Sequence, residues 1–171
     1  MALRSILTYP DPFLKQPASA VKNFGDSLQR LLSDMADTMY EAPGVGLAAN
    51  QIGVNASILI FDPDPDPEKR NYRVLANPVI IESDGTFISE DEGCLSVPDF
   101  RATVKRYNRI RVEAKNENGE PICLDLEGFP AVIVQHEMDH LHGLLFIDRI
   151  SPLKRNLYTR RVAKQLRRET A

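Results

Sequence analysis

The sequence has no run of about 18 apolar residues, so no segment of it is expected to cross a membrane as a helix. It also lacks an amino-terminal apolar segment with a small-residue cleavage site, so we interpret its start as mature protein and not as a signal peptide. Internal repeats and low-complexity linkers are absent as well. Its 171 residues, 43% apolar and 26% charged, therefore predict one globular domain that covers residues 1–171.

Cysteine and histidine are scarce. The two cysteines, Cys94 and Cys123, could form one disulfide, but a soluble chain without a signal peptide suggests a reducing cytosol. We therefore expect a cytoplasmic protein in which each thiol is either a small core residue or a chemically active one. The three histidines all lie within seven residues, in the segment QHEMDHLHG, Gln135 to Gly143.

Charge is unevenly distributed along the chain, whose formal net charge is −3. Residues 154–171 contain seven Lys or Arg and one Glu, a charge of +6, whereas the other 14 basic and 23 acidic residues give −9. This basic tail is a candidate docking element for RNA, for example at the ribosome. The alternative, which we favour, is a solvated amphipathic helix whose Leu157, Val162 and Leu166 pack on the body. We expect no contact with membranes or with DNA.

The pattern of apolar residues predicts an α+β fold. The predicted helices are 26–41, 130–142 and about 152–171, and the predicted strands are 57–62, 72–81 and a hairpin over 109–128 that turns at Asn118-Gly119. The segment DPDPDPEKR after the first strand is expected to be a solvated loop. We expect antiparallel β-sheets around the central helix 130–142, with the amphipathic helix 26–41 packed outside and a carboxyl-terminal helix.

The segment QHEMDH places His136 and His140 four residues apart around Glu137. Positions four apart project to one side of a helix, so both imidazoles can bind one cation. Glu137 lies about 100° round the helix axis, close enough to contact a water molecule held by that cation. Imidazole suits zinc and iron(II), and metal-bound water is a usable nucleophile near neutral pH. A pair of hydrogen-bonded structural histidines is the alternative, but H-E-x-x-H on a buried helix favours metal binding.

Two histidines leave a cation short of protein ligands, and several residues are candidates for the third. Phe146 occupies the position of the third histidine in an extended metallopeptidase motif, and His142 faces another side of the helix as a surface or capping residue. Asp148 is the better of the downstream acids, and Cys123 in a predicted strand is interpreted as core. Cys94, in the irregular polar turn EDEGCLSVP, suits a reactive thiolate. It would complete a His2Cys set with an open fourth position.

Three segments together resemble the signature motifs of the peptide deformylase family: GVGLAANQ (44–51), EGCLS (92–96) and QHEMDHLHG (135–143). They occur in this order, and the resemblance covers nearly the whole chain. It implies a bacterial-type hydrolase of the cytoplasm, or of an organelle, that removes the N-formyl group from the initiator formyl-methionine of newly made polypeptides. Residues 1–171 would be one catalytic domain, and formate would be released.

The resemblance also implies roles for motif residues. The implied ligands are Cys94, His136 and His140, which would hold one divalent cation, Fe²⁺ in the cell, with Zn²⁺, Ni²⁺ or Co²⁺ as replacements. Glu137 would be the general base for a metal-bound hydroxide that attacks the formyl carbon, and then the proton donor to the leaving amine. The side-chain amide of Gln51 and the backbone N–H of Leu95 would stabilise charge on the formyl oxygen.

The implied substrate-binding residues are Gly44, Val45, Gly46, Glu92, Gly93, Arg101, Phe129, Val132 and Ile133. The glycines would let a peptide backbone pair as an added strand at Val45 and Gly46, whatever its side chains. Apolar members would line a pocket for methionine, with Glu92 near its mouth, and Arg101 would hold a peptide carbonyl or be solvated. Phe129-Pro130 replaces two aliphatic residues common in the family, which alters the shape of this pocket.

Two other classes of protein share some of these features. A metallopeptidase that cuts internal peptide bonds shares the H-E-x-x-H motif, but it would need a third ligand downstream and would give Cys94 no role. A noncatalytic module stapled by a metal ion would explain the ligands, but it would leave Glu137 without a function.

Overall fold

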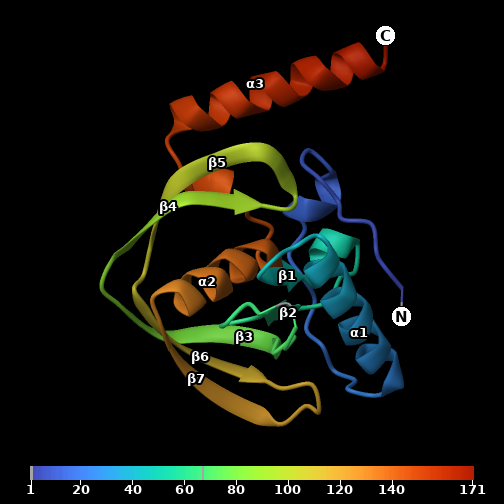
Figure 1. The fold of residues 1–171 in the computed structure, drawn as a ribbon, viewed down its shortest axis with the longest axis vertical. Helices are drawn as coiled ribbons and strands as arrows, with labels where there is room; N and C mark the ends of the chain where they lie inside the picture. The colour runs from blue at the N-terminus through green and yellow to red at the C-terminus, as the bar shows by residue number, and fades with distance from the viewer. Residues whose placement is uncertain (1, 67) are drawn as a thin grey trace.

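The α+β fold expected from the sequence is present in a computed structural model, which describes residues 2–66 and 68–171 (Figure 1). The α-helices are α1 (Asp26–Glu41), α2 (Phe129–Leu141) and α3 (Pro152–Glu169), and the short 3-10 helices are η1 (Pro12–Lys15), η2 (Ala49–Ile52) and η3 (Phe146–Arg149). The strands are β1 (Gly46–Ala48), β2 (Ile58–Phe61), β3 (Arg73–Asp84), β4 (Phe87–Cys94), β5 (Val97–Arg106), β6 (Arg109–Lys115) and β7 (Pro121–Glu127).

Five strands form an antiparallel sheet in the order β1-β2-β3-β6-β7, and β4 pairs with β5 in a separate two-stranded sheet. The predicted hairpin over 109–128 is β6–β7, in register from Arg109 opposite Glu127 to Lys115 opposite Pro121. Gly119 in its turn has a φ of 81°, a conformation that costs other residues more than glycine.

Helices α1 and α2 cover opposite faces of this sheet (Figure 1). Strand β2 shows the reason, because all four of its residues are apolar and successive side chains point to opposite faces. Leu59 and Phe61 join the core under α2, whereas Ile58 and Ile60 join the core under α1. The part of the sheet formed by β1, β2 and the start of β3 is therefore buried on both faces, and α2 lies at the centre of the molecule.

Helix α2 is enclosed almost completely, with residues 131–141 all buried. A helix that is apolar over most of its surface is stable only when other elements cover all of its sides, and the segment FPAVIV makes the first half of α2 apolar in this way. Pro130 lies in the first turn, as expected, and Gly143 follows the helix with a φ of 76°. A Cβ at Gly143 would collide with the carbonyl oxygen of Lys15, so glycine lets η1 pass the end of α2.

The hairpin of β4 and β5 differs from the expectation that EDEGCLSVP is an irregular turn. Cys94 is the last residue of β4 and pairs with Val97 of β5, so the turn is limited to Leu95 and Ser96. The glycine and the acidic residues of β4 are poor strand formers, which hides this strand in the sequence. The interpretation of Cys123 as a core residue is also wrong, because Cys123 is exposed on the edge strand β7.

Two further expectations concern surface segments. The segment DPDPDPEKR, expected to be a solvated loop, is exposed at Asp64 and Pro65, while Pro67 lies outside the described residues. Asp62 is an exception, because it is buried and accepts a hydrogen bond from the Tyr40 hydroxyl at 2.6 Å. Helix α3 packs through Tyr158 and Val162. Among the helices of the described residues, none combines the length and apolar character that crossing a membrane requires.

The expected packing of α3 is therefore only partly correct. Val162 is buried, but Leu157 and Leu166 are 60% and 41% exposed. Figure 1 shows the reason, since α3 runs past the β4–β5 hairpin and its carboxyl-terminal half extends away from the body.

Candidate metal centre and active-site cavity

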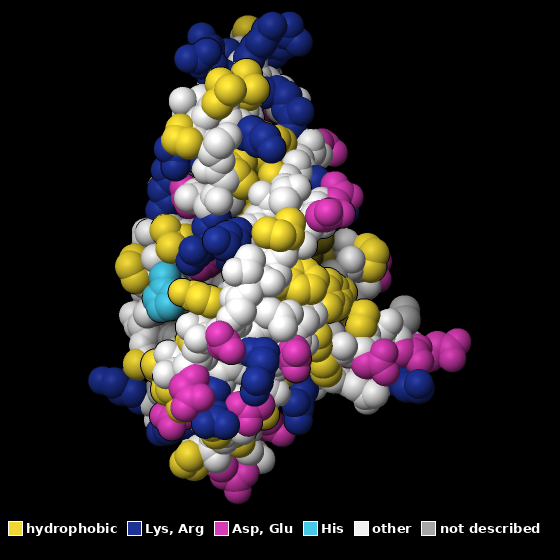
Figure 2. Space-filling view, turned by 90° about the vertical axis from the view of Figure 1, so that its left-hand side faces the viewer, with side chains coloured by type: hydrophobic (Ala, Val, Ile, Leu, Met, Phe, Trp, Pro, Cys, Tyr) yellow, Lys and Arg dark blue, Asp and Glu magenta, His cyan; other side chains and the backbone are white. Residues whose placement is uncertain are grey.

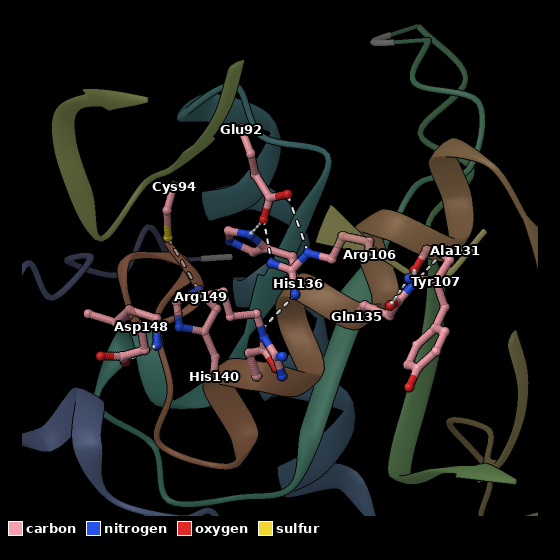
Figure 3. Close-up of polar contacts among 12 residues, drawn as sticks. Glu92, Cys94, Arg106, Tyr107, Ala131, Gln135, His136, His140, Asp148 and Arg149 are labelled. Carbon is pink, nitrogen blue, oxygen red and sulfur yellow. Dashed lines mark hydrogen bonds and ion pairs between the residues drawn. The ribbon is translucent and has the colours of Figure 1, made fainter. Parts of the chain in front are cut away.

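Cys94, His136 and His140 converge at the junction of β4 and α2 (Figure 3). One ligand atom from each of the three lies within 4.8 Å of the others, and the Cys94 sulfur is 3.2 Å from Nε2 of His140. The two histidines project from successive turns of α2, as four-residue spacing requires, while Cys94 ends β4. The structure thus brings together the residues that the motifs singled out.

The two imidazoles have different surroundings. Nδ1 of His136 is 2.7 Å from a carboxylate oxygen of Glu92, which leaves Nε2 free on the side of Cys94. Burial lowers the pKa of His136, but the Cys94 sulfur and the Glu92 carboxylate outweigh it and raise that pKa well above its usual value. Burial and the nearby His136 lower the pKa of His140, so this ring is neutral, the form that binds metals.

Glu137 lies beside these ligands in the wall of a cavity, and its side chain is almost fully buried. Its Oε2 atom has no hydrogen-bond partner among the described residues. Burial raises the pKa of Glu137 to about 7, against the opposing charge of His136. A carboxylate with this pKa can both accept and return a proton near neutral pH.

Gln51 is held against the sulfur of Cys94. Its Oε1 accepts the backbone N–H of Ala48 at 2.9 Å, which directs Nε2 toward the Ser96 hydroxyl at 3.1 Å and the Cys94 sulfur at 3.7 Å. The sulfur also receives the backbone N–H of Ser96 at 3.4 Å. Ser96 was not singled out from the sequence, although it lies in the EGCLS segment.

The cavity of about 760 Å³ lies between β1, the β4–β5 hairpin and the start of α2. Residues from all three motifs line it, including Gln51, Cys94, Leu95, His136 and Glu137. Every residue expected to bind substrate also lines it: Gly44, Val45, Gly46, Glu92, Gly93, Arg101, Phe129, Val132 and Ile133. The structure therefore joins the candidate metal ligands and one substrate-sized cavity in a single site.

Comparison with known proteins identifies the family. The family model described as polypeptide deformylase matches residues 3–156. A peptide deformylase from Desulfosudis oleivorans is 46% identical over 167 residues, which cover 98% of this chain and 96% of the relative. The chain belongs to the polypeptide deformylase family. It is an enzyme that removes the N-formyl group from newly made polypeptides.

Solved structures agree with this assignment. A peptide deformylase from Legionella pneumophila superposes with a TM-score of 0.89 at 44% identity, covering 99% of this chain and 98% of that one. A class I type b peptide deformylase from Acinetobacter baumannii, solved with Met-Ala-Ser bound, gives 0.82 at 36% identity and covers 87% of this chain and 99% of that one.

The deformylase site also fits a divalent cation on its own geometry. One cysteine sulfur and two imidazoles are donors that zinc and iron(II) accept, and the adjoining cavity leaves one side of the set open. Other candidate ligands lie outside this set: Asp148 caps the Leu145 N–H at 2.9 Å, and His142 is an exposed residue at the end of α2.

Glu92 differs from its expected place near the mouth of the pocket. Its carboxylate is 7% exposed and turns inward to His136 and to the guanidinium of Arg106. Burial opposes its charge, but these two partners lower the pKa of Glu92 to about 2. Sequence reasoning missed Arg106, because it ends a strand in which most basic residues are exposed. It also missed Asp139, which pairs with Arg106 at 2.7 Å.

Two residues at the rim have contacts that the sequence did not show. Arg101 is exposed and donates to the backbone carbonyl of Asp91 at 3.1 Å. A Cβ on Gly93 would lie 3.3 Å from the guanidinium of Arg101, so glycine lets this side chain lie along β4. Phe129 is 50% exposed at the start of α2, where it leaves an open apolar edge on the cavity.

Proposed function

We propose that this deformylase works with one divalent cation held by Cys94, His136 and His140, and with Glu137 as the group that moves the proton. The observation that supports this most directly is buried Glu137, which lines the cavity beside the three ligands and whose Oε2 has no hydrogen-bond partner among the described residues. A cation bound there supplies Lewis acidity to a water molecule and to the formyl oxygen.

Glu137 accepts a proton from the attacking water and returns it to the nitrogen of the leaving amine. Its pKa of about 7 suits both steps, because the group is neither a strong acid nor a strong base at neutral pH. Charge that develops on the formyl oxygen is stabilised by Nε2 of Gln51 and by the backbone N–H of Leu95. Gln51 cannot turn away easily, since its Oε1 is held by the Ala48 N–H.

The substrate is a peptide that begins with formyl-methionine. Val45, Phe129, Val132 and Ile133 give the cavity an apolar wall that can accept an unbranched thioether side chain. The edge strand β1, next to Gly44 and Val45, offers backbone groups to an extended peptide whatever its later side chains are. The Acinetobacter baumannii relative with Met-Ala-Ser bound supports a peptide that begins with methionine.

Replacing Glu137 with Gln tests the proton transfer. We expect kcat for release of formate from formyl-Met-Ala-Ser to fall by about 10²–10⁴-fold, with the cation content unchanged. The matched control is Glu113→Gln on the exposed face of β6, which should leave kcat unchanged. Full activity of Glu137→Gln would contradict the role of this residue. Cleavage of casein by the protein without substitutions would instead favour a metallopeptidase.

We propose Fe²⁺ as the cation in the cell, with Zn²⁺, Ni²⁺ or Co²⁺ able to replace it. Iron(II) and the Cys94 thiolate are both open to oxidation, so the iron form should lose activity faster in aerated buffer than the nickel or zinc form. Equal half-lives of the three forms, measured by formate release, would contradict this choice.

We also propose that α3 contacts the ribosome and that the enzyme acts in the bacterial cytoplasm. Figure 2 shows basic side chains gathered at the end of the molecule that α3 occupies, while acidic ones lie mainly elsewhere on that face. Changing Arg160, Lys164, Arg167 and Arg168 to Gln should abolish co-sedimentation with ribosomes at low salt. Unchanged co-sedimentation would contradict this contact.

A further inference from the structure

Four charged side chains form a chain behind His136, and Figure 3 labels three of them, Glu92, Arg106 and Arg149. Nδ1 of His136 contacts Glu92 at 2.7 Å, and both oxygens of Glu92 accept hydrogen bonds from Arg106. Arg106 continues to Asp139 through Nη1 at 2.7 Å. Arg149 ends the chain, with Nε and Nη2 each 2.6 Å from an oxygen of Asp139.

Most of this chain of charged side chains is buried. The side chains of Glu92, Arg106 and Asp139 are 7%, 2% and 7% exposed, whereas Arg149 is 44% exposed. Charges removed from water need partners of opposite sign, and here acidic and basic groups alternate from His136 outward. The chain therefore has one buried end on an imidazole of the metal centre and one end at the surface.

The chain of charged side chains also connects the elements that carry the ligands. Glu92 precedes Cys94 by two residues on β4, and Asp139 lies between His136 and His140 on α2. Arg106 bonds to both acids, so its guanidinium holds β4 against α2 at the level of the site. A shift of either element would change the separation between the Cys94 sulfur and the two imidazoles.

We propose that Arg106, Asp139 and Arg149 are positioning residues, which keep β4 and α2 in the geometry that retains the cation. This inference rests on the proposed function, in which Cys94, His136 and His140 are the ligands. Outer partners of ligating residues commonly change metal affinity when they are removed, because they fix the ring and raise its basicity. Nδ1 of His140 has no partner among the described residues, so the chain acts through His136 and β4.

Release of Co²⁺ tests the proposal without relying on activity. The protein is loaded with Co²⁺ and mixed with excess chelator, and the absorption of the cobalt–sulfur bond is followed at pH 7. We expect Arg149→Met and Asp139→Asn to release Co²⁺ about tenfold faster than the unchanged protein and to shift that absorption. Arg149→Lys should restore most of the slow release, since it keeps the positive charge beside Asp139.

The matched control is Arg155→Met, because Arg155 is 39% exposed and only 4.0 Å from Asp148, outside the chain of charges. It should release Co²⁺ at the unchanged rate. Unchanged release from both Arg149→Met and Asp139→Asn would overturn the proposal, as would equal acceleration in Arg155→Met. Should Asp139→Asn fail to fold, as judged by circular dichroism, Arg149→Met at the exposed end decides the question.

The same measurement separates this inference from the proposed function. Failure of the unchanged protein to bind Co²⁺ would overturn the ligand set and, with it, the positioning role. Normal binding by the unchanged protein, together with normal release from the Arg149 and Asp139 variants, would overturn the positioning role alone.

Discussion

At the scale of single residues, Gly46 shows how closely the site is packed. A Cβ at this position would lie 2.7 Å from Oε1 of Glu137 and 2.9 Å from Cγ2 of Ile133. Both distances are shorter than a carbon can approach without displacing its neighbours. Gly46 therefore does more than allow a peptide to pair along β1, because it also leaves the space that Glu137 occupies.

Replacing Gly46 with Ala should therefore lower kcat by up to about 10²-fold, since a small displacement of a catalytic group is costly. The measurement is formate release from a formyl-methionyl peptide. Gly25→Ala is the control, because the added Cβ at this exposed cap would lie 3.1 Å from a single side-chain atom of Asn23. Equal kcat for the two variants would contradict this explanation of Gly46.

Asp34 gives a prediction for the dependence of stability on pH. The backbone N–H of Ala2 and the guanidinium of Arg4 lower the pKa of Asp34 below 3.8. Because its pKa is lower in the folded state, the ionised Asp34 stabilises that state at pH values above 3.8. This stabilisation is lost as the pH falls through the folded-state pKa of Asp34. Asp34→Asn should thus lower the urea midpoint at pH 7, and the difference should vanish in acid. A difference that persists unchanged at low pH would contradict this origin.

At the scale of elements, the two halves of α3 have different roles. Tyr158 is 3% exposed, and its ring centroid lies 4.7 Å from the ring centroid of Phe100. Phe100 in turn lines the active-site cavity. Residues 163–171 are all exposed. The first half therefore supports the β4–β5 hairpin, and the second half is free for a partner.

Tyr158→Ala should lower the free energy of unfolding by about 3 kcal/mol, because it leaves a cavity among aromatic rings. Truncation after Ala163 removes only exposed residues and should change that free energy by no more than about 0.5 kcal/mol. Urea unfolding measures both. A large loss of stability on truncation would show that the second half of α3 also packs on the body.

At the scale of the whole molecule, we expect the core to form without the cation. Helices α1 and α2 cover opposite faces of the sheet where β1 and β2 lie, and the core residues on each side are apolar and come from several elements. A domain of 171 residues buries enough surface to fold without a metal staple.

Removal of the cation should therefore lower Tm without unfolding the protein at 25 °C. A ligand at 100 times its Kd stabilises by about 2.7 kcal/mol, which corresponds to roughly 5–10 °C in Tm for a domain of this size. Circular dichroism of the chelated protein should keep the helical signal and show one cooperative transition. Loss of that signal at 25 °C would show that the metal centre is part of the folding core.

The sequence by itself determined the family, the three α-helices, the β6–β7 hairpin and the residues of the three motifs. These features are local, since helical spacing puts His136 and His140 on one side and a short turn fixes the hairpin. Only the tertiary structure decided which charged side chains meet behind His136, because Glu92, Arg106, Asp139 and Arg149 come from four elements and no spacing relates them. It also decided that Cys123 is exposed and that β4 is a strand, since both depend on which side chains the neighbouring elements cover.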